Sequence, residues 1–176
     1  MAMTHESLVL AFPDDDVTVT SPVDLPTAIT DPTARRVLTE IGFPEHVEQC
    51  LWFEALDTPL VTLASSGYSP FETTAARAAD FYVIGVSTAG LLCLDGVSGE
   101  CYFVDDKGNV LLAAFQLDRL LEFAWRLKTD IDSGHVGETW EQRLIADFRK
   151  LDPLTLATSE DKWRDVIAAC HANALS

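Results

Sequence analysis

The sequence has few basic residues. Its 176 residues include 12 Lys and Arg against 28 Asp and Glu, which gives a formal net charge of −16. The deficit is largest in residues 1–115, where 17 acidic residues face 4 basic ones, against 11 and 8 in residues 116–176. Such a surface repels nucleic acid phosphates and anionic membranes, and it attracts a basic protein. A second interpretation stays open, in which the acidity serves solubility alone.

The sequence also lacks long hydrophobic runs. No stretch approaches the roughly 20 apolar residues that a membrane-spanning helix needs. Residues 1–6 carry no basic segment of the kind that begins a secretion signal. Hydrophobic residues still make up 48% of the chain and charged residues 23%, which is enough apolar surface for a packed core. We therefore expect a cytoplasmic protein with one globular domain.

Paired cysteines are missing as well. Cys50, Cys93, Cys101 and Cys170 form no C-x-x-C pair, which disfavours a zinc site and a thiol redox motif. In a cytoplasmic chain of this size we expect buried thiols in place of a disulfide framework. Cys93 and Cys101 can lie near each other across a hairpin, each as a small buried hydrophobic residue.

Motifs for catalysis and cofactor binding are absent too. The chain contains no G-x-G-x-x-G and no G-x-x-x-x-G-K-[ST], so nucleotide phosphates have no recognisable cradle. Ser87 lacks the glycine that a nucleophile elbow needs two positions later, because Ala89 stands there. The acidic residues of segment 130–141 have the spacing of a calcium loop, but His135 occupies the position where that loop needs glycine. The sequence thus predicts no catalytic residue, no cofactor and no metal site.

The first 30 residues contain no basic residue and only short apolar segments. We interpret residues 1–30 as an acidic N-terminal arm, extended, with an edge strand at Val17–Thr20. Residues 31–176 are expected to form a single domain. Its first element is a helix over 31–41, because Asp31 is a good N-cap, Pro32 suits the first helical position and Gly42 supplies a stop.

The rest of the chain divides into a strand-rich middle and a helical end. The segments 96–99 and 105–109 are rich in Gly, Asp and Asn and predict tight turns. Three apolar stripes at helical spacing follow, and the third helix is expected to begin at Ser159. The fold class is therefore α+β, with a mainly antiparallel β-meander packed against flanking helices. The predicted strands are Leu60–Leu63, Phe81–Val86, Leu91–Leu94, Glu100–Val104 and Val110–Ala113.

An ordered series of short motifs resembles the SUKH superfamily of bacterial immunity proteins, and more narrowly its fourth family, of actinobacterial type. The series comprises residues 38–44 (LTEIGFP), 90–95 (GLLCLD), 99–106 (GECYFVDD) with a helix from about Gln116, and 151–153 (LDP) followed by Trp163. The resemblance spans residues 31–170 and leaves out the acidic first 30. Ala113–Phe115 also depart from the small polar residue that such families place before the helix.

The resemblance implies a binding role without catalytic residues. Members protect the producing cell by binding a polymorphic toxin, often one that acts on nucleic acid, so the partner expected here is a basic cognate toxin, with neither nucleic acid nor membrane as a direct partner. We expect the toxin-facing residues to include the acidic residues that flank or cap the meander and one open tryptophan. Ordinary turn solvation or core packing is the alternative for each. The candidates are Asp80, Asp95, Glu100, Asp105, Asp106 and Trp52.

Two rival functions remain open from the sequence. The first is a regulatory or scaffold module of the same fold that has no toxin partner, since superfamily relatives in other lineages act in this way. The second is an enzyme with an unfamiliar site, which predicts a deep pocket lined by perturbed acids and a histidine.

Overall fold

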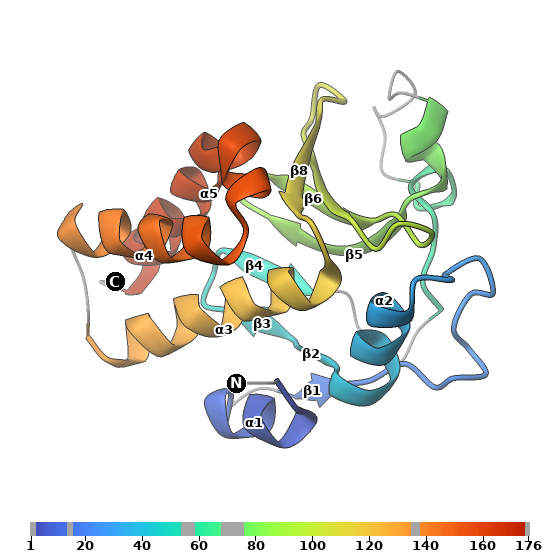
Figure 1. The fold of residues 1–176 in the computed structure, drawn as a ribbon, viewed down its shortest axis with the longest axis horizontal. Helices are drawn as coiled ribbons and strands as arrows, with labels where there is room; N and C mark the ends of the chain where they lie inside the picture. Colours follow the sequence, from blue (N-terminus) through green and yellow to red (C-terminus); the bar gives the residue numbers. More distant parts are fainter. Residues whose placement is uncertain (1–2, 14–15, 54–58, 68–75, 135–137, 175–176) are drawn as a thin grey trace.

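The computed structural model describes residues 3–13, 16–53, 59–67, 76–134 and 138–174. Within these ranges the chain folds into a six-stranded antiparallel sheet, a two-stranded sheet and a set of helices (Figure 1). The predicted α+β class with a mainly antiparallel sheet is confirmed. None of the described helices combines the length and the apolar character that crossing a bilayer requires.

The large sheet is a meander in which each strand pairs with the next strand along the chain. The predicted turns at 96–99 and 105–109 join its last three strands, and the strands predicted from residue 81 onward are confirmed within a few residues. Two short strands ahead of them are not predicted from the sequence. In order across the sheet, the strands are β3 (His46–Val47), β4 (Leu51–Phe53), β5 (Tyr82–Ser87), β6 (Gly90–Leu94), β7 (Cys101–Val104) and β8 (Val110–Ala114).

The strand predicted at Leu60–Leu63 is reduced to a single antiparallel bridge, which is flanked by two backbone hydrogen bonds, from Val83 to Val61 and from Leu63 to Phe81. Thr62 makes an isolated bridge with Tyr82, and a short 3-10 helix, η2 (Leu63–Ser65), begins at the next residue. Leu60 belongs to the large core, whereas Leu63 belongs to a smaller cluster. The segment is apolar because it passes between two hydrophobic clusters, and a run this short looks like a strand in the sequence.

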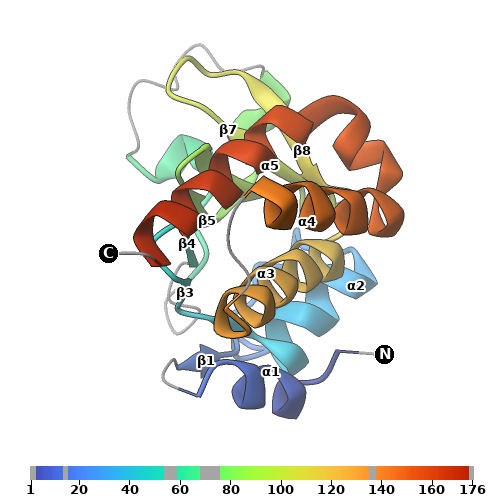
Figure 2. The ribbon, with the colours of Figure 1, turned by 90° about the vertical axis from the view of Figure 1, so that its left-hand side faces the viewer.

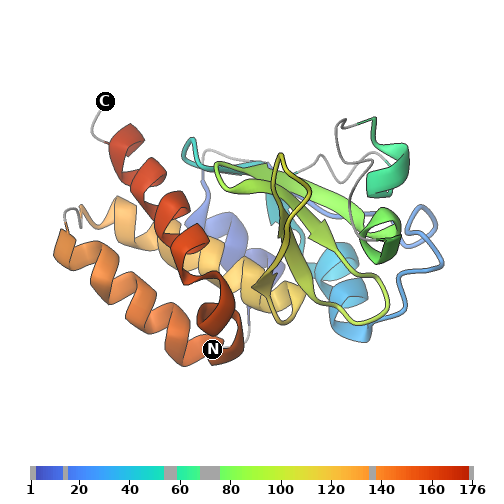
Figure 3. The same cartoon turned by 90° about the horizontal axis from the view of Figure 1, so that it is seen from above.

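The two faces of the sheet bury separate hydrophobic clusters, because side chains alternate along a strand. On β6, Leu92 belongs to the large core beneath the long helices, whereas Leu91 belongs to the smaller cluster on the other face. Leu63 of η2 and Ala78 of a second 3-10 helix, η4 (Ala76–Asp80), join this smaller cluster. Figure 3 shows the long helices on one side of the sheet and these short helices on the other. We call the side of the smaller cluster the outer face and the side of the large core the inner face.

Three long helices follow the sheet and cover its inner face (Figure 2). Their apolar stripes meet at Trp163, which is fully buried and whose Nε1 donates a hydrogen bond to the carbonyl oxygen of Ala113 on β8 at 2.9 Å. The ring of Trp163 makes edge contacts with Phe103, Phe123 and Phe148, which come from the sheet and two other helices. The helices are α3 (Leu117–Asp132), α4 (Glu138–Leu151) and α5 (Pro153–Ala174).

The last helix begins earlier than predicted. Asp152 caps it, because its Oδ1 accepts the backbone N–H of Thr155 at 3.0 Å, and Pro153 occupies the first helical position. Ser159, the predicted start, lies inside α5 with φ −133° and ψ 20° and interrupts the helical geometry. The polar cap signal at Ser159 therefore marks a kink between two helical segments.

The extended arm expected over residues 1–30 is wrong in its described part. Residues His5–Ala11 form helix α1, whose first turn is closed by reciprocal hydrogen bonds between Thr4 and Ser7. Leu8 and Phe12 are buried in the large core. The short apolar segments of this region therefore anchor the chain to the domain, because even a seven-residue helix gains stability when one face is packed.

The helix predicted over 31–41 is confirmed, with a change of pitch part-way along it. Helix α2 (Pro32–Arg36) is capped by Asp31, and a π-helical turn, η1 (Val37–Ile41), continues it. Gly42 ends the segment with φ +85°, and a Cβ there would overlap the carbonyl oxygen of Thr18. Glycine permits this close approach next to the pairing of two short strands, β1 (Val17–Thr18) and β2 (Phe43–Pro44). The predicted edge strand at Val17–Thr20 is therefore confirmed over its first half.

The expectation of four free thiols is wrong for one pair. Cys50 and Cys170 form a disulfide with a Cα–Cα distance of 5.2 Å, which joins the start of β4 to α5. Spacing alone cannot show this pair, because 120 positions separate the two residues. Cys93 and Cys101 are free and buried on neighbouring strands, but they belong to the clusters on opposite faces. Burial raises the pKa of the Cys93 thiol to about 12.

Candidate functional site

Two of the predicted acidic residues order the turn between β6 and β7. The Oδ1 atom of Asp95 accepts the backbone N–H groups of Val97 at 2.9 Å and Ser98 at 3.2 Å. The Oε2 atom of Glu100 accepts hydrogen bonds from the Ser98 hydroxyl at 3.0 Å and from the Tyr102 hydroxyl at 2.6 Å. Both carboxylates are therefore held in place by local hydrogen bonds.

Asp80 lies beside this turn, although 15 positions separate it from Asp95 in the sequence. Both residues line one hollow of about 460 Å³, which also includes Phe81 and Val97. The side chain of Val97 is 72% exposed, and Asp80 is exposed at the end of η4. We call this hollow, which is lined by two carboxylates and an exposed apolar residue, the acidic hollow.

Tyr102 connects Glu100 to the acidic hollow. Its ring stacks on that of Phe81 with a centroid distance of 4.8 Å, while its hydroxyl donates to Glu100. Tyr102 is partly buried against the smaller cluster, so it lies on the outer face. The structure thus brings three of the predicted residues, Asp80, Asp95 and Glu100, to one end of the outer face.

Asp105 and Asp106 lie at the opposite end of β7. Asp105 closes the next turn, because Oδ1 accepts the backbone N–H groups of Lys107 at 3.0 Å and Asn109 at 2.9 Å. The side-chain amide of Asn109 also donates to Oδ2 at 2.9 Å, and this hydrogen bond is the main cause that lowers the pKa of Asp105. Asp106 is exposed. The predicted acidic residues therefore form two groups, one at each end of the strand.

Trp52 lies on the outer face, at some distance along the sheet from either group. It is paired in register with Val86 of β5, and Val86 packs against the smaller cluster. Residues directly opposite each other on paired strands share a face. The side chain is 41% exposed, so Trp52 is open to contact, as expected from the sequence.

Sequence reasoning missed two residues of this surface, Val97 and Tyr102. Val97 is an apolar residue inside a Gly- and Ser-rich turn, a position where exposure is the rule. Tyr102 alternates with the buried Cys101 and Phe103 on β7, and this alternation could have placed it on the outer face.

The acidic residues with calcium-loop spacing point to different partners. Asp130 accepts hydrogen bonds from Trp140 and Arg143, whereas Asp132 pairs with Lys128. Among the residues that the structure describes, no three metal-ligating side chains gather to hold an ion. The position of His135 lies outside the described residues.

The sequence matches a known family over most of its length. The family model described as "SUKH-4 immunity protein" matches residues 3–169. The chain belongs to the SUKH-4 immunity protein family. No curated protein and no solved structure matches it. The match begins at residue 3, which corrects the expectation that the first 30 residues lie outside the resemblance: α1 and β1 belong to the SUKH-4 region.

The SUKH-4 motifs have structural roles in this chain. Asp95 and Asp105 close turns of the meander, Gly42 ends the first helical segment and Asp152 caps α5. These residues determine where the strands and helices begin and end. Membership of the SUKH-4 family supports an immunity function.

Proposed function

We propose that the protein protects its cell by binding a cognate toxin of a polymorphic toxin system and covering the working surface of that toxin. The toxin is basic and acts on nucleic acid, and the encounter takes place in the cytoplasm. The inhibitor needs no cofactor and performs no catalysis, because occupation of the surface is sufficient. Family membership over residues 3–169 and the net charge of −16 support this proposal.

The observation that carries the proposal is the acidic hollow. Its carboxylates come from two separate elements, η4 and the β6–β7 turn, and the exposed side chain of Val97 lines the same hollow. An apolar centre with a charged rim is the usual anatomy of a protein interface. Carboxylates at the rim suit Arg and Lys side chains, which a nucleic-acid-binding toxin presents on its working surface.

One partner of ordinary size can reach both acidic groups and Trp52. A stable interface covers roughly 800 Å² on each partner. The four residues of β7 extend about 13 Å at the usual rise per residue, and β4, which contains Trp52, lies three strand spacings from β7, about 14 Å. Tyr102, Val86 and Val110 are partly buried apolar residues of the outer face. We therefore place the toxin on the outer face, with Trp52 as an anchor and the acidic groups at its rim.

The rim is tested by charge reversal at Asp80, which is exposed and closes no turn. Asp80→Lys is expected to slow association with the cognate toxin by about three- to tenfold at low salt, with a smaller difference at high salt, because steering depends on the local field. The matched control is Asp161→Lys on α5, which makes the same change in net charge on the helical side. Equal slowing by both variants in stopped-flow measurements would remove the acidic hollow from the interface.

The anchor is tested by Trp52→Ala. If Trp52 is buried by the toxin, dissociation accelerates by about tenfold or more, since interface tryptophans are frequent hot spots. The matched control is Leu154→Ala on α5, because Leu154 is also an exposed large hydrophobic residue. Dissociation of the Trp52 variant at the wild-type rate excludes Trp52 from the interface.

A further inference from the structure

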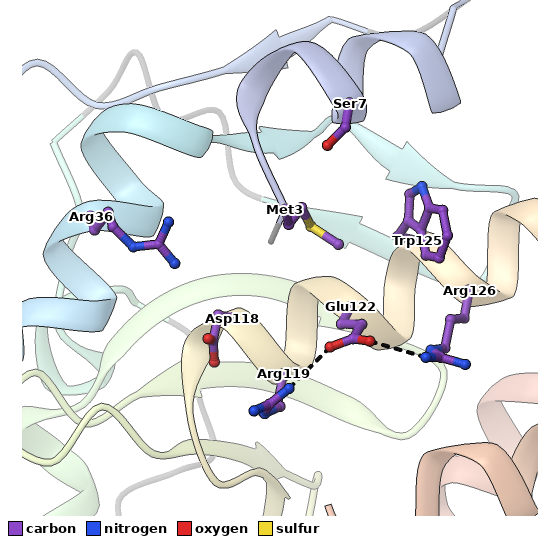
Figure 4. A pocket seen from close by; sticks show the side chains of 8 residues that line it. All are labelled: Met3, Ser7, Arg36, Asp118, Arg119, Glu122, Trp125 and Arg126. Carbon is purple, nitrogen blue, oxygen red and sulfur yellow. Dashed lines mark hydrogen bonds and ion pairs between the residues drawn. The ribbon is translucent and has the colours of Figure 1, made fainter. Parts of the chain in front are cut away.

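A cleft on the helical side of the molecule has no role in the proposed toxin interface. It lies between α1, α2 and α3, away from the outer face of the sheet, and has a volume of about 430 Å³ (Figure 4). Volumes of this size are typical of sites for small molecules. Met3 and Trp125 supply apolar walls, and ionised side chains of both signs complete the lining.

Most of the charge in this cleft is internally balanced. Glu122 lies between two guanidinium groups, with Oε2 3.1 Å from Nη1 of Arg119 and Oε1 3.1 Å from Nη2 of Arg126. One carboxylate shared by two arginines leaves a small positive excess there. These ion pairs fix the charged side chains of α3 that line this part of the cleft.

Arg36 and Asp118 differ from this network because their charges are not paired among the residues that the structure describes. Within the described part of the chain, neither side chain forms an ion pair, and Oδ1 of Asp118 accepts no hydrogen bond although it is shielded from solvent. A shielded carboxylate oxygen without a donor is costly. The other oxygen, Oδ2, is not shielded in this way, so Asp118 can present it to an occupant of the cleft. The cleft therefore contains one cation and one anion that can each bind an occupant.

The two unpaired charges lie at the same end of the cleft. Arg36 comes from α2 and Asp118 from the first turn of α3, and Figure 4 shows both side chains at that end, with Trp125 toward the other. Trp125 follows Asp118 by seven positions on α3, which places it on the same helical face about 10 Å further along the axis. Met3 lies between Asp118 and Trp125 in Figure 4.

From this arrangement we infer that the cleft binds a free α-amino acid with a large apolar or aromatic side chain. The α-carboxylate accepts hydrogen bonds from the Arg36 guanidinium, and the α-ammonium donates to the Asp118 carboxylate. The side chain then extends along α3 between Met3 and Trp125. A simple anion would leave Asp118 unpaired, and a simple cation would leave Arg36 unpaired, so a zwitterion fits both charges.

The inference is independent of the proposed function, because the cleft and the outer face share no residue. Occupancy of the cleft joins α2, through Arg36, and Met3, which precedes α1, to α3. A bound amino acid is therefore expected to stabilise the fold in proportion to its concentration above its Kd.

The test uses the full chain and follows the indole N–H resonance of Trp125, assigned with Trp125→Phe, during titration with L-phenylalanine. L-Phenylalanine is expected to shift this resonance saturably while those of Trp140 and Trp163 stay in place. N-Acetyl-L-phenylalanine lacks the ammonium and L-phenylalaninamide lacks the carboxylate, and each is expected to bind at least about tenfold more weakly, since a hydrogen bond between charged groups is lost.

Two variants assign the charges. Asp118→Asn is expected to abolish the discrimination against the N-acetyl compound, and Arg36→Gln the discrimination against the amide. The control Asp165→Asn, on an exposed part of α5, keeps both. Arg36 is exposed, so its variant tests the inference even if Asp118→Asn unfolds. Absence of a saturable shift with L-phenylalanine, L-leucine and L-methionine, or equal binding of the blocked compounds, overturns the inference.

Discussion

Asp152 links three elements of the fold, and its substitution by Asn gives a quantitative test. The carboxylate accepts the backbone N–H of Phe115 at 2.7 Å, and the backbone N–H and hydroxyl of Thr155 at 3.0 and 2.7 Å. It therefore joins the end of β8 and the approach to α3 to the first turn of α5. The residue is 4% exposed, so water cannot easily replace a lost partner.

Asn keeps the shape of the side chain and one of its two acceptors. Its oxygen can still cap α5 through Thr155, but the amide nitrogen then faces the N–H of Phe115, donor against donor. An N–H group left without an acceptor in such a place costs about 1–3 kcal/mol. We take about 2 kcal/mol, which lowers the midpoint of thermal unfolding by roughly 4–8 °C for a chain of this length.

The measurement is thermal unfolding followed by circular dichroism, with urea unfolding as a second probe. Asp165→Asn, which removes one charge from an exposed position on the same helix, is expected to change stability by less than about 0.5 kcal/mol. Asp152→Ala is expected to cost more than Asn, because it also removes the cap. An Asn variant as stable as the wild type would refute the role assigned to Asp152.

Three further predictions concern a turn, a titration and the thiols. Gly42→Ala is expected to destabilise the protein by about 2 kcal/mol or more, since its backbone conformation suits glycine and the new Cβ meets the carbonyl of Thr18; wild-type urea unfolding would contradict this. Asn109→Ala is expected to raise the pKa of Asp105 toward 3.8, because the main hydrogen-bond donor to its carboxylate is removed. The variant is then less stable than the wild type above the pKa that Asp105 has in the unfolded chain, and this difference disappears as pH falls through the lower pKa of the folded wild type. A carboxyl titration of Asp105 by NMR that does not move would contradict this prediction. Without reductant, a thiol reagent is expected to find no reactive thiol in the native protein and two after unfolding. Addition of reductant is expected to lower the midpoint of unfolding. Four reactive thiols in the unfolded protein without reductant would exclude the disulfide.

Local signals in the sequence predict the second half of the fold well. The turns of the meander are built from Gly, Asp and Asn, and Asp105 alone accepts three hydrogen bonds within its own turn. The long helices have apolar stripes that a 3.6-residue period reveals. The same reasoning fails for α1 and for β3 and β4, which have seven, two and three residues, because elements so short owe their conformation to packing.

The candidate sites depend on contacts that no local pattern contains. Asp95 and Glu100 are predictable as turn residues, but the approach of Asp80 to Asp95 follows from the packing of η4 against the sheet. The cleft that contains Arg36 and Asp118 joins residues 82 positions apart. Long-range juxtapositions of this kind require the fold, because each residue alone looks like ordinary surface charge in the sequence.

Inhibition by occupation, as proposed above, means that one molecule of this protein blocks one molecule of toxin. The most direct measurement is a titration of the purified cognate toxin domain with this protein, followed by the remaining nuclease or deaminase activity at toxin concentrations well above Kd. A blocking partner lowers activity in proportion to the amount added, with an end point at a fixed, near-equimolar ratio, and the activity returns when the complex dissociates. Complete and lasting inactivation by a few per cent of one equivalent would show turnover, and unchanged activity at excess would show no inhibition; either result contradicts the account.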